Sequence, residues 1–229
     1  MKTKYLTMKM WLIIFTVFMA TSPLFSQNTK DVAIVLKSNG KVTVKESTTK
    51  KWKKGRRGKR LDSGDIVKTY DNSFAAIMFT DDKTMLKVRN NSLLAIRGKR
   101  EKKSISKRIV CSLGNFWLKV KKQHSQMIVE TPSGVAAVKG TEFYGIVNED
   151  GSTMIIAIDG LIQLMNKFGE QFIKAGQTGK MAKGEAPKVE DTDPNLKLDW
   201  GSEGDDENEL NLEFEDANGN KKHLKVKYH

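Results

Sequence analysis

Apolar residues in this chain recur at every second position, in short runs separated by Gly, Asn, Asp and Ser. Alternation of this kind is typical of β-strands with one buried face. No stretch between residues 32 and 180 shows apolar residues at helical spacing. The pattern predicts an all-β fold, a single domain of many short strands arranged as a sandwich or a solenoid-like sheet. The runs are Val42/Val44, Ala75/Ile77/Phe79, Leu86/Val88, Leu94/Ile96, Phe116/Leu118/Val120, Met127/Val129, Tyr144/Ile146, Met154/Ile156/Ile158 and Ile162/Leu164.

Turn-forming residues lie between these runs. Gly64-Asp65 and Gly140-Thr141 each separate two apolar runs, where glycine allows a positive φ and a side-chain oxygen can bond the nearby backbone. Thr131-Pro132 follows the run at Met127 and Val129, and proline removes a ladder donor, so we expect the strand to end there. A structural role is the simpler interpretation of these residues, and a ligand contact is the alternative.

Several short motifs follow one another in a fixed order. They are Leu61-Asp62-Ser63-Gly64-Asp65, Ser73-Phe74-Ala75, Phe79-Thr80-Asp81-Asp82, Ser92, Leu113-Gly114, Thr131-Pro132, Val138-Lys139-Gly140-Thr141-Glu142-Phe143, Thr153, Gly160 and Gly176-Gln177. Together they resemble the FecR domain, an all-β module of bacterial envelope proteins, over roughly residues 32 to 180. The resemblance implies signalling across the envelope without naming a ligand. The best-known members carry a cytoplasmic segment that binds a sigma factor, whereas here only nine residues precede the first apolar run, so a free-standing exported domain is the better comparison.

The amino terminus has the features of a secretory signal peptide. Three lysines precede an apolar run of 11 residues, Met10 to Ala20, and a processing site before Gln27 follows. A bilayer span needs about 20 apolar residues, so a retained anchor is the less favoured alternative. We therefore predict a cleaved signal peptide over residues 1–26 and a periplasmic or secreted protein of the cell envelope.

The rest of the chain divides by composition. Residues 27–180 form the predicted FecR-like all-β domain, and residues 181–209 form a polar, acidic linker. Residues 210–229 contain Asn218-Gly219 between two alternating apolar runs, which is a strong β-hairpin signal. An isolated hairpin is marginal in water, so this one needs the parent domain or the sheet edge of a partner.

Charge is distributed unevenly. Residues 27–189 hold 32 Lys and Arg against 15 Asp and Glu, whereas residues 190–229 hold 5 against 12. Two basic clusters dominate. Because both fall where turns interrupt the predicted strands, we expect their side chains to be solvated. The first cluster is Lys50, Lys51, Trp52, Lys53, Lys54, Arg56, Arg57, Lys59 and Arg60; the second cluster is Arg97, Lys99, Arg100, Lys102, Lys103, Lys107 and Arg108.

Three interpretations of the clusters remain open. They can be a solubilising surface that protects sheet edges. They can bind an anionic partner such as envelope polymer or a membrane surface, with nucleic acid disfavoured by export. They can also bind the chain's own acidic residues 205–216.

Catalytic and metal-binding patterns are lacking in the sequence. The three histidines, His124, His223 and His229, have no metal-ligand spacing, and no nucleophile motif occurs. Turn formation explains the aspartates at 65, 71, 81 and 82. The single cysteine, Cys111, alternates with Ile109 and Leu113, which predicts a core side chain.

These observations predict an exported, non-enzymatic interaction or envelope-sensing module without a cofactor, whose partner is an envelope protein. The alternative is a charge-driven binder of anionic envelope polymer or membrane surface. A contiguous apolar patch or a free sheet edge would favour the protein partner, and one merged basic face would favour the alternative.

Overall fold

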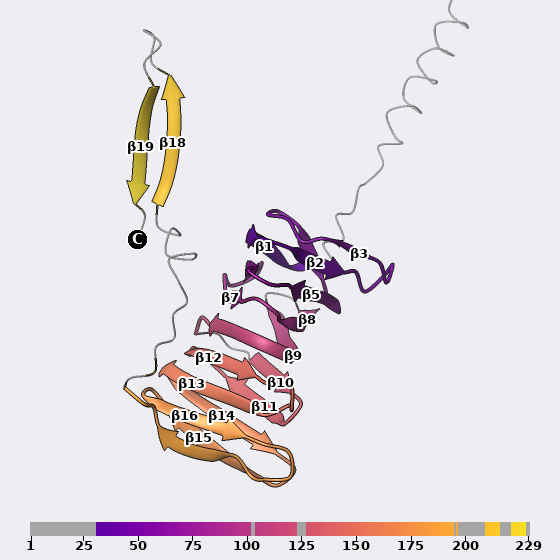
Figure 1. Ribbon diagram of the computed structural model, residues 1–229, viewed down its shortest axis with the longest axis vertical. Coiled ribbons are helices and arrows are strands. Elements are labelled where there is room, and N and C mark those ends of the chain that lie inside the picture. Colours follow the sequence, from indigo (N-terminus) through magenta and orange to yellow (C-terminus); the bar gives the residue numbers. More distant parts are fainter. Residues whose placement is uncertain are drawn as a thin grey trace, which may run out of the picture. The chain divides into compact units, whose positions relative to one another are not determined.

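The computed structural model describes residues 31–101, 104–122, 127–194, 196, 209–215 and 221–227, and within them every regular element is a β-strand (Figure 1). The predicted signal peptide, Lys102, Lys103, His124, His229 and residues 195 and 197–208 of the predicted linker lie outside the described residues. No helix of the described part is long and apolar enough to span a membrane. The strands are β1 (Asp31–Asn39), β2 (Val42–Lys45), β3 (Trp52–Lys54), β4 (Arg60–Asp62), β5 (Asp65–Thr69), β6 (Phe74–Phe79), β7 (Met85–Val88), β8 (Leu93–Arg100), β9 (Ile105–Lys119), β10 (Met127–Thr131), β11 (Gly134–Val138), β12 (Glu142–Val147), β13 (Thr153–Asp159), β14 (Leu161–Asn166), β15 (Gly169–Lys174), β16 (Gln177–Met181), β17 (Lys188–Asp191), β18 (Glu209–Glu215) and β19 (Lys221–Lys227).

Strands β1 to β17 form two ladders that share one strand. Ladder A runs β4, β1, β6, β7, β9, β12, β13, β16, β17. Ladder B runs β3, β2, β5, β8, β9, β10, β11, β14, β15. Among the described strands, neighbours are antiparallel except β9 and β10, which are parallel. The predicted all-β class is therefore confirmed, with both ladders open at their ends.

Strand β9 passes from ladder B to ladder A. Its first half pairs with β8 and β10, and its second half, from Gly114 onward, pairs with β7 and β12. Gly114 has φ of +108°, a conformation that L side chains rarely adopt. The buried side chains of β9 change from odd positions, such as Ile109, to even positions, such as Phe116. The glycine thus lets one strand keep its apolar side chains in the core of both ladders.

The core lies between the inner faces of the two ladders. A Cβ added to Gly98 of β8 would lie 2.8 Å from Cγ1 of Val32 in β1, and one added to Gly179 of β16 would lie 2.0 Å from Cδ1 of Leu164 in β14. Phe116 and Phe143 pack edge to face with ring centroids 6.1 Å apart. Large buried side chains from both ladders form one continuous cluster, so the two ladders stabilise each other.

The C-terminal strands β18 and β19 form a separate antiparallel two-stranded sheet, which confirms the predicted hairpin. The register pairs Leu210 with Val226 and Leu212 with Leu224. The Asn218-Gly219 turn itself lies outside the described residues.

Candidate functional site

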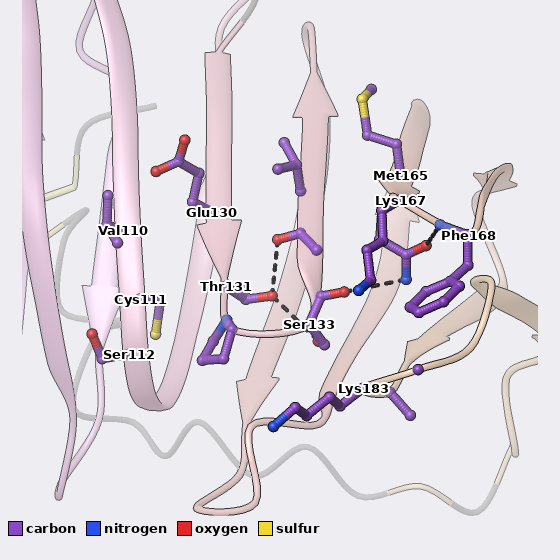
Figure 2. A pocket seen from close by; sticks show the side chains of 16 residues that line it. Val110, Cys111, Ser112, Glu130, Thr131, Ser133, Met165, Lys167, Phe168 and Lys183 are labelled. Atoms are coloured by element: carbon purple, nitrogen blue, oxygen red, sulfur yellow. Dashed lines mark hydrogen bonds between the residues drawn. The ribbon is translucent and has the colours of Figure 1, made fainter.

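An open groove of about 650 Å³ lies where β9 leaves ladder B (Figure 2). Val110 to Ser112 of β9 line one side, and Lys167, Phe168 and Lys183 line the other. Its size falls within the range typical of ligand pockets. Its apolar lining consists of Val110, Pro132, Val135, Met165, Phe168 and Ala182, and its charged lining consists of Glu130, Lys167 and Lys183.

The path of two strands explains the groove. Strand β10 pairs with β9 only as far as Glu130 opposite Val110, and it ends at Thr131. Pro132 has no backbone N–H and cannot extend the ladder. Strand β9 then moves over to ladder A. Beyond Val110 and Glu130, β10 therefore has no paired β9 residue beside it, and the gap between the two strands forms the open groove.

Hydrogen bonds within the protein use the polar groups beside the groove. The Ser133 hydroxyl donates to Thr153 (2.8 Å), which donates to the Thr131 hydroxyl (2.9 Å). The Asn166 amide donates to the Ser133 carbonyl (3.3 Å) and to the Glu185 carbonyl (2.7 Å). These bonds hold the β10–β11 turn to its neighbours. Figure 2 shows the contact between the Thr131 and Ser133 hydroxyls within the turn. Internal hydrogen bonds therefore fix this wall of the groove, and six apolar side chains form much of the remaining lining.

The Cys111 thiol beside this groove is poorly suited to act as a nucleophile. Cys111, on the groove side of β9, is buried, and burial raises the pKa of its thiol to about 12. The described residues contain no cluster of three or more His, Cys, Asp or Glu side chains that could hold a metal ion. The burial of Cys111 agrees with its predicted place in the core.

An apolar strip continues from the groove along the outer face of β14 and β15. In the ladder, Leu161 lies opposite Lys174, Gln163 opposite Phe172, and Met165 opposite Glu170, so Leu161, Phe172 and Met165 are diagonal neighbours on one face. Leu161 is 57% exposed and Phe172 51% exposed. The described residues place no strand in register along the other edge of β15. This end of ladder B thus combines an apolar strip with an open strand edge.

The structure brings the two predicted basic clusters together at Asp31. The Arg60 guanidinium of the first cluster pairs with the Asp31 carboxylate at 2.5 Å, and Arg100 of the second cluster donates to the Asp31 carbonyl at 2.9 Å. Gly98 N–H also donates to the Ser63 hydroxyl at 3.0 Å, which ties the β8–β9 hairpin to the β4–β5 turn. The clusters occupy strands more than turns, because β3, the end of β8 and the start of β9 carry several of their residues.

Lys107 departs from the expected solvated surface. Its side chain is 4% exposed and donates to Asp81 and Asp82, in each case at 2.7 Å. Lys107 lies at an odd position of β9, on the same face as Ile105 and Ile109, so it points inward. The expectation of solvent exposure is therefore wrong at this residue. Arg108, the next residue, faces outward and pairs with Glu130.

The first cluster is partly neutralised by Glu46. Lys53 and Lys59 pair with the two carboxylate oxygens of Glu46 at 2.8 and 2.6 Å. Hydrogen bonds from Lys53, then Lys59 and Thr49, lower the pKa of Glu46 from 4.5 to about 2. Trp52 is 46% exposed at the outer end of ladder B.

The residues of the family turns have local partners. Gly64 and Gly140 have φ of +92° and +64°. The buried carboxylate of Asp65 accepts from the backbone N–H groups of Ser47 (2.8 Å) and Asp62 (3.0 Å). Thr141 and Phe143 are buried, and the Thr141 carbonyl accepts from Val120 N–H at 2.8 Å. These contacts give them a structural part in the fold.

Sequence reasoning missed the groove and the apolar strip. Leu161, Met165, Phe168 and Phe172 are dispersed in the sequence, and only Ile162 and Leu164 of this region stand out by alternation. An available signal was the second apolar set of β14 at Leu161 and Met165. A strand apolar on both faces presents an apolar surface outside the core as well.

Residues 65–163 match the family described as FecR protein. The match extends from the start of β5 into β14 and agrees with the FecR resemblance found in the sequence. The described ladders continue beyond it on both sides.

Two crystal structures of a candidate anti-sigma factor from Parabacteroides distasonis are similar to part of the chain. They share 13% and 12% sequence identity with TM-scores of 0.48 and 0.49. Each likeness covers 56% of this chain and 60% of the other, so the chain matches less than two thirds of those structures. No curated protein matches the sequence.

Proposed function

We propose that this protein is an exported, non-enzymatic FecR-type module that senses or transmits a signal by binding an envelope protein. The FecR match supports a signalling or sensing role. The observation that carries the protein partner is the apolar strip of Leu161, Phe172 and Met165, which joins an apolar groove and borders an open strand edge. Contiguous apolar surface of this kind is typical of interaction sites.

An extended segment of the partner suits this surface. Added along the free edge of β15, it would satisfy the open backbone groups of that strand, and its alternate side chains would lie on the outer face beside Phe172. Apolar side chains there would reach the strip and the groove. The groove also has three charged lining residues, Glu130, Lys167 and Lys183. They would favour a partner segment that places polar or charged groups beside them.

Site-specific photo-crosslinking tests this function. A photoreactive residue replaces Gln163 or Glu170, which lie beside the strip, and a control carries it at Lys68 of β5 in the other half of ladder B. Cross-linked envelope proteins are identified by mass spectrometry from cells. We expect one protein to be captured at the β14–β15 positions and lost in the variant Leu161→Ser/Phe172→Ser. Equal capture at Lys68, or capture unaffected by that variant, would contradict the proposal.

A second candidate function is charge-driven attachment to anionic envelope polymer or a membrane surface. The meeting of the two basic clusters at Asp31 favours it, because this contact makes them neighbours on one surface. A merged basic surface raises the local concentration of anions. Export and envelope location, for either function, are proposed from residues 1–26.

A further inference from the structure

A second pocket, of about 520 Å³, lies at the opposite end of ladder B, beside β2 and β3. It lies between the β1–β2 turn and the segment that leaves β3. Four of its nine lining residues are cationic and none is acidic. The cationic residues are Lys41, Lys54, Arg56 and Arg57.

Local backbone contacts bring these four residues together. Lys54 lies opposite Thr43 in the β2–β3 ladder, and Gly55 N–H donates to the Val42 carbonyl at 2.9 Å. A Cβ at Gly55 would lie 2.8 Å from Cγ1 of Val42, so only a glycine lets the chain run this close to β2. The two arginines follow directly, and the turn at Gly40 places Lys41 on the other side of the pocket.

Ion pairing divides the first basic cluster into two parts. Lys53 and Lys59 are neutralised by Glu46, and Arg60 by Asp31. Lys54, Arg56 and Arg57 make no ion pair with any residue that the structure describes. Lys41 lies over the ring of Tyr70, with Nζ 4.2 Å from the centroid, which orients the ammonium without cancelling its charge. The four cations that line the pocket therefore keep their charge uncompensated by any described carboxylate.

We infer that this pocket binds a phosphoryl group. Two adjacent guanidinium groups can donate paired hydrogen bonds to the oxygens of one phosphate, and the two ammonium groups add point charges. The pocket volume leaves room for the group that carries the phosphate. This inference gives the charge-driven candidate a defined site, and it is independent of the proposed protein site at β15.

The test compares two variants of the full chain that each lose three positive charges. One is Lys54→Ser/Arg56→Ser/Arg57→Ser in the pocket. The control is Lys121→Ser/Lys122→Ser/Lys139→Ser, on exposed positions outside the pocket and outside both basic clusters. Binding of pyrophosphate is measured by calorimetry and by shifts of the Gly55 and Arg56 amide resonances, after thermal melts show that both variants are folded.

We expect the pocket variant to lose at least about tenfold in affinity, because hydrogen bonds to charged groups are each worth about 1.5 to 3 kcal/mol and about 1.4 kcal/mol is a factor of ten. The control should lose less than about threefold, through weaker general attraction. Equal losses in the two variants, or wild-type protein that binds no pyrophosphate at low salt, would overturn the inference.

Two further arms identify the source of the phosphate. Vesicles of phosphatidylglycerol in phosphatidylcholine present it on a lipid, and soluble polyphosphate presents it on a polymer. Pocket-dependent binding to one and not the other assigns the source. Photo-crosslinking from β14–β15 in the pocket variant separates the two functions, because loss of phosphate binding should leave those protein cross-links unchanged.

Discussion

At the residue scale, the buried ionic cluster of Lys107, Asp81 and Asp82 is the clearest departure from sequence expectation. The Asp82 carboxylate also accepts from Thr84, and Asp81 accepts from the N–H of Ile105. Burying such groups is costly unless they pair, and here Lys107 contacts both carboxylates, while Asp81 Oδ1 has no hydrogen-bond partner among the described residues. In the sequence, all cationic residues of a basic run look alike. Only the odd or even position along β9 distinguishes the inward Lys107 from the outward Arg108.

Lys107→Met should destabilise the fold by about 3 to 5 kcal/mol, because it leaves two carboxylates buried without their cation. The triple variant Lys107→Met/Asp81→Asn/Asp82→Asn should recover much of that loss, since no uncompensated charge then remains. Urea unfolding monitored by tryptophan fluorescence measures both. A Lys107→Met protein as stable as wild type would show that the cluster contributes nothing to folding.

Glu46 predicts a pH-dependent contribution to stability. Its pKa in the folded protein, about 2, lies below its ordinary value of 4.5. The unfolded chain therefore binds the proton more readily, and stability rises with pH across this window. The contribution is complete above about pH 4.5 and is lost as the pH falls to about 2.

The difference in melting temperature between wild type and Glu46→Gln should therefore be largest near neutral pH and should shrink as the pH falls through this window. Thermal melts from pH 7 to pH 2 measure it, with Glu149→Gln as the control at an exposed glutamate. A difference that stays constant over that range would exclude the ion pairs with Lys53 and Lys59 as its cause.

At the element scale, alternation predicts strands well and their partners poorly. Val42 and Val44 of β2, or Leu86 and Val88 of β7, are buried as a half-buried strand requires. In β12, however, Phe143 and Val147 face the core, and Tyr144 and Ile146 of the predicted run lie on the other face. When both faces of a strand carry apolar residues, period two alone does not tell which face is inside.

The sequence also did not reveal that β9 belongs to both ladders. The change of parity across Gly114 is visible in the sequence, but its meaning depends on which strands lie on either side. The groove has the same origin, because it forms between segments far apart in the chain. The basic clusters could be found from sequence since their residues are consecutive, whereas their meeting at Asp31 needed the register of β1, β4 and β8.

Gly114→Ala should destabilise the protein more than Gly176→Ala. Both glycines have positive φ, +108° and +81°, and the backbone strain alone is worth about 1 to 3 kcal/mol. A Cβ at Gly114 would also lie 2.5 Å from Cα of Ser92, whereas nothing lies within 4 Å at Gly176. Urea unfolding of the two variants compares them directly. Equal losses would mean that β9 tolerates a side chain where it changes ladders.

At the scale of the whole molecule, the basic ladders and the acidic C-terminal part of the chain have opposite charge. Residues 197–229 hold 9 Asp and Glu against 5 Lys and Arg. Opposite charges on one chain attract, and that attraction competes with external anions at low salt.

Removing residues 197–229 leaves β17 complete and should strengthen attachment to phosphatidylglycerol vesicles. We expect the gain to be largest at low ionic strength and to fade when the Debye length falls to about 8 Å at physiological salt. Co-sedimentation across a salt series measures it, and the Lys54→Ser/Arg56→Ser/Arg57→Ser variant with the same truncation serves as control. Attachment that is unchanged by the truncation would mean that the acidic residues do not cover the basic surface.

The sharing of β9 has a consequence for how proteins of this architecture can change. New strands can be added beyond β3, β4, β15 or β17, because each of these ends a ladder and offers a neighbour to pair with. Strand β9, in the centre of both ladders, offers no such free edge, because each half of it already pairs on both sides. The two ends of the ladders, where we place the two binding sites, can therefore gain or lose strands separately, whereas a break within β9 would disrupt both ladders at once.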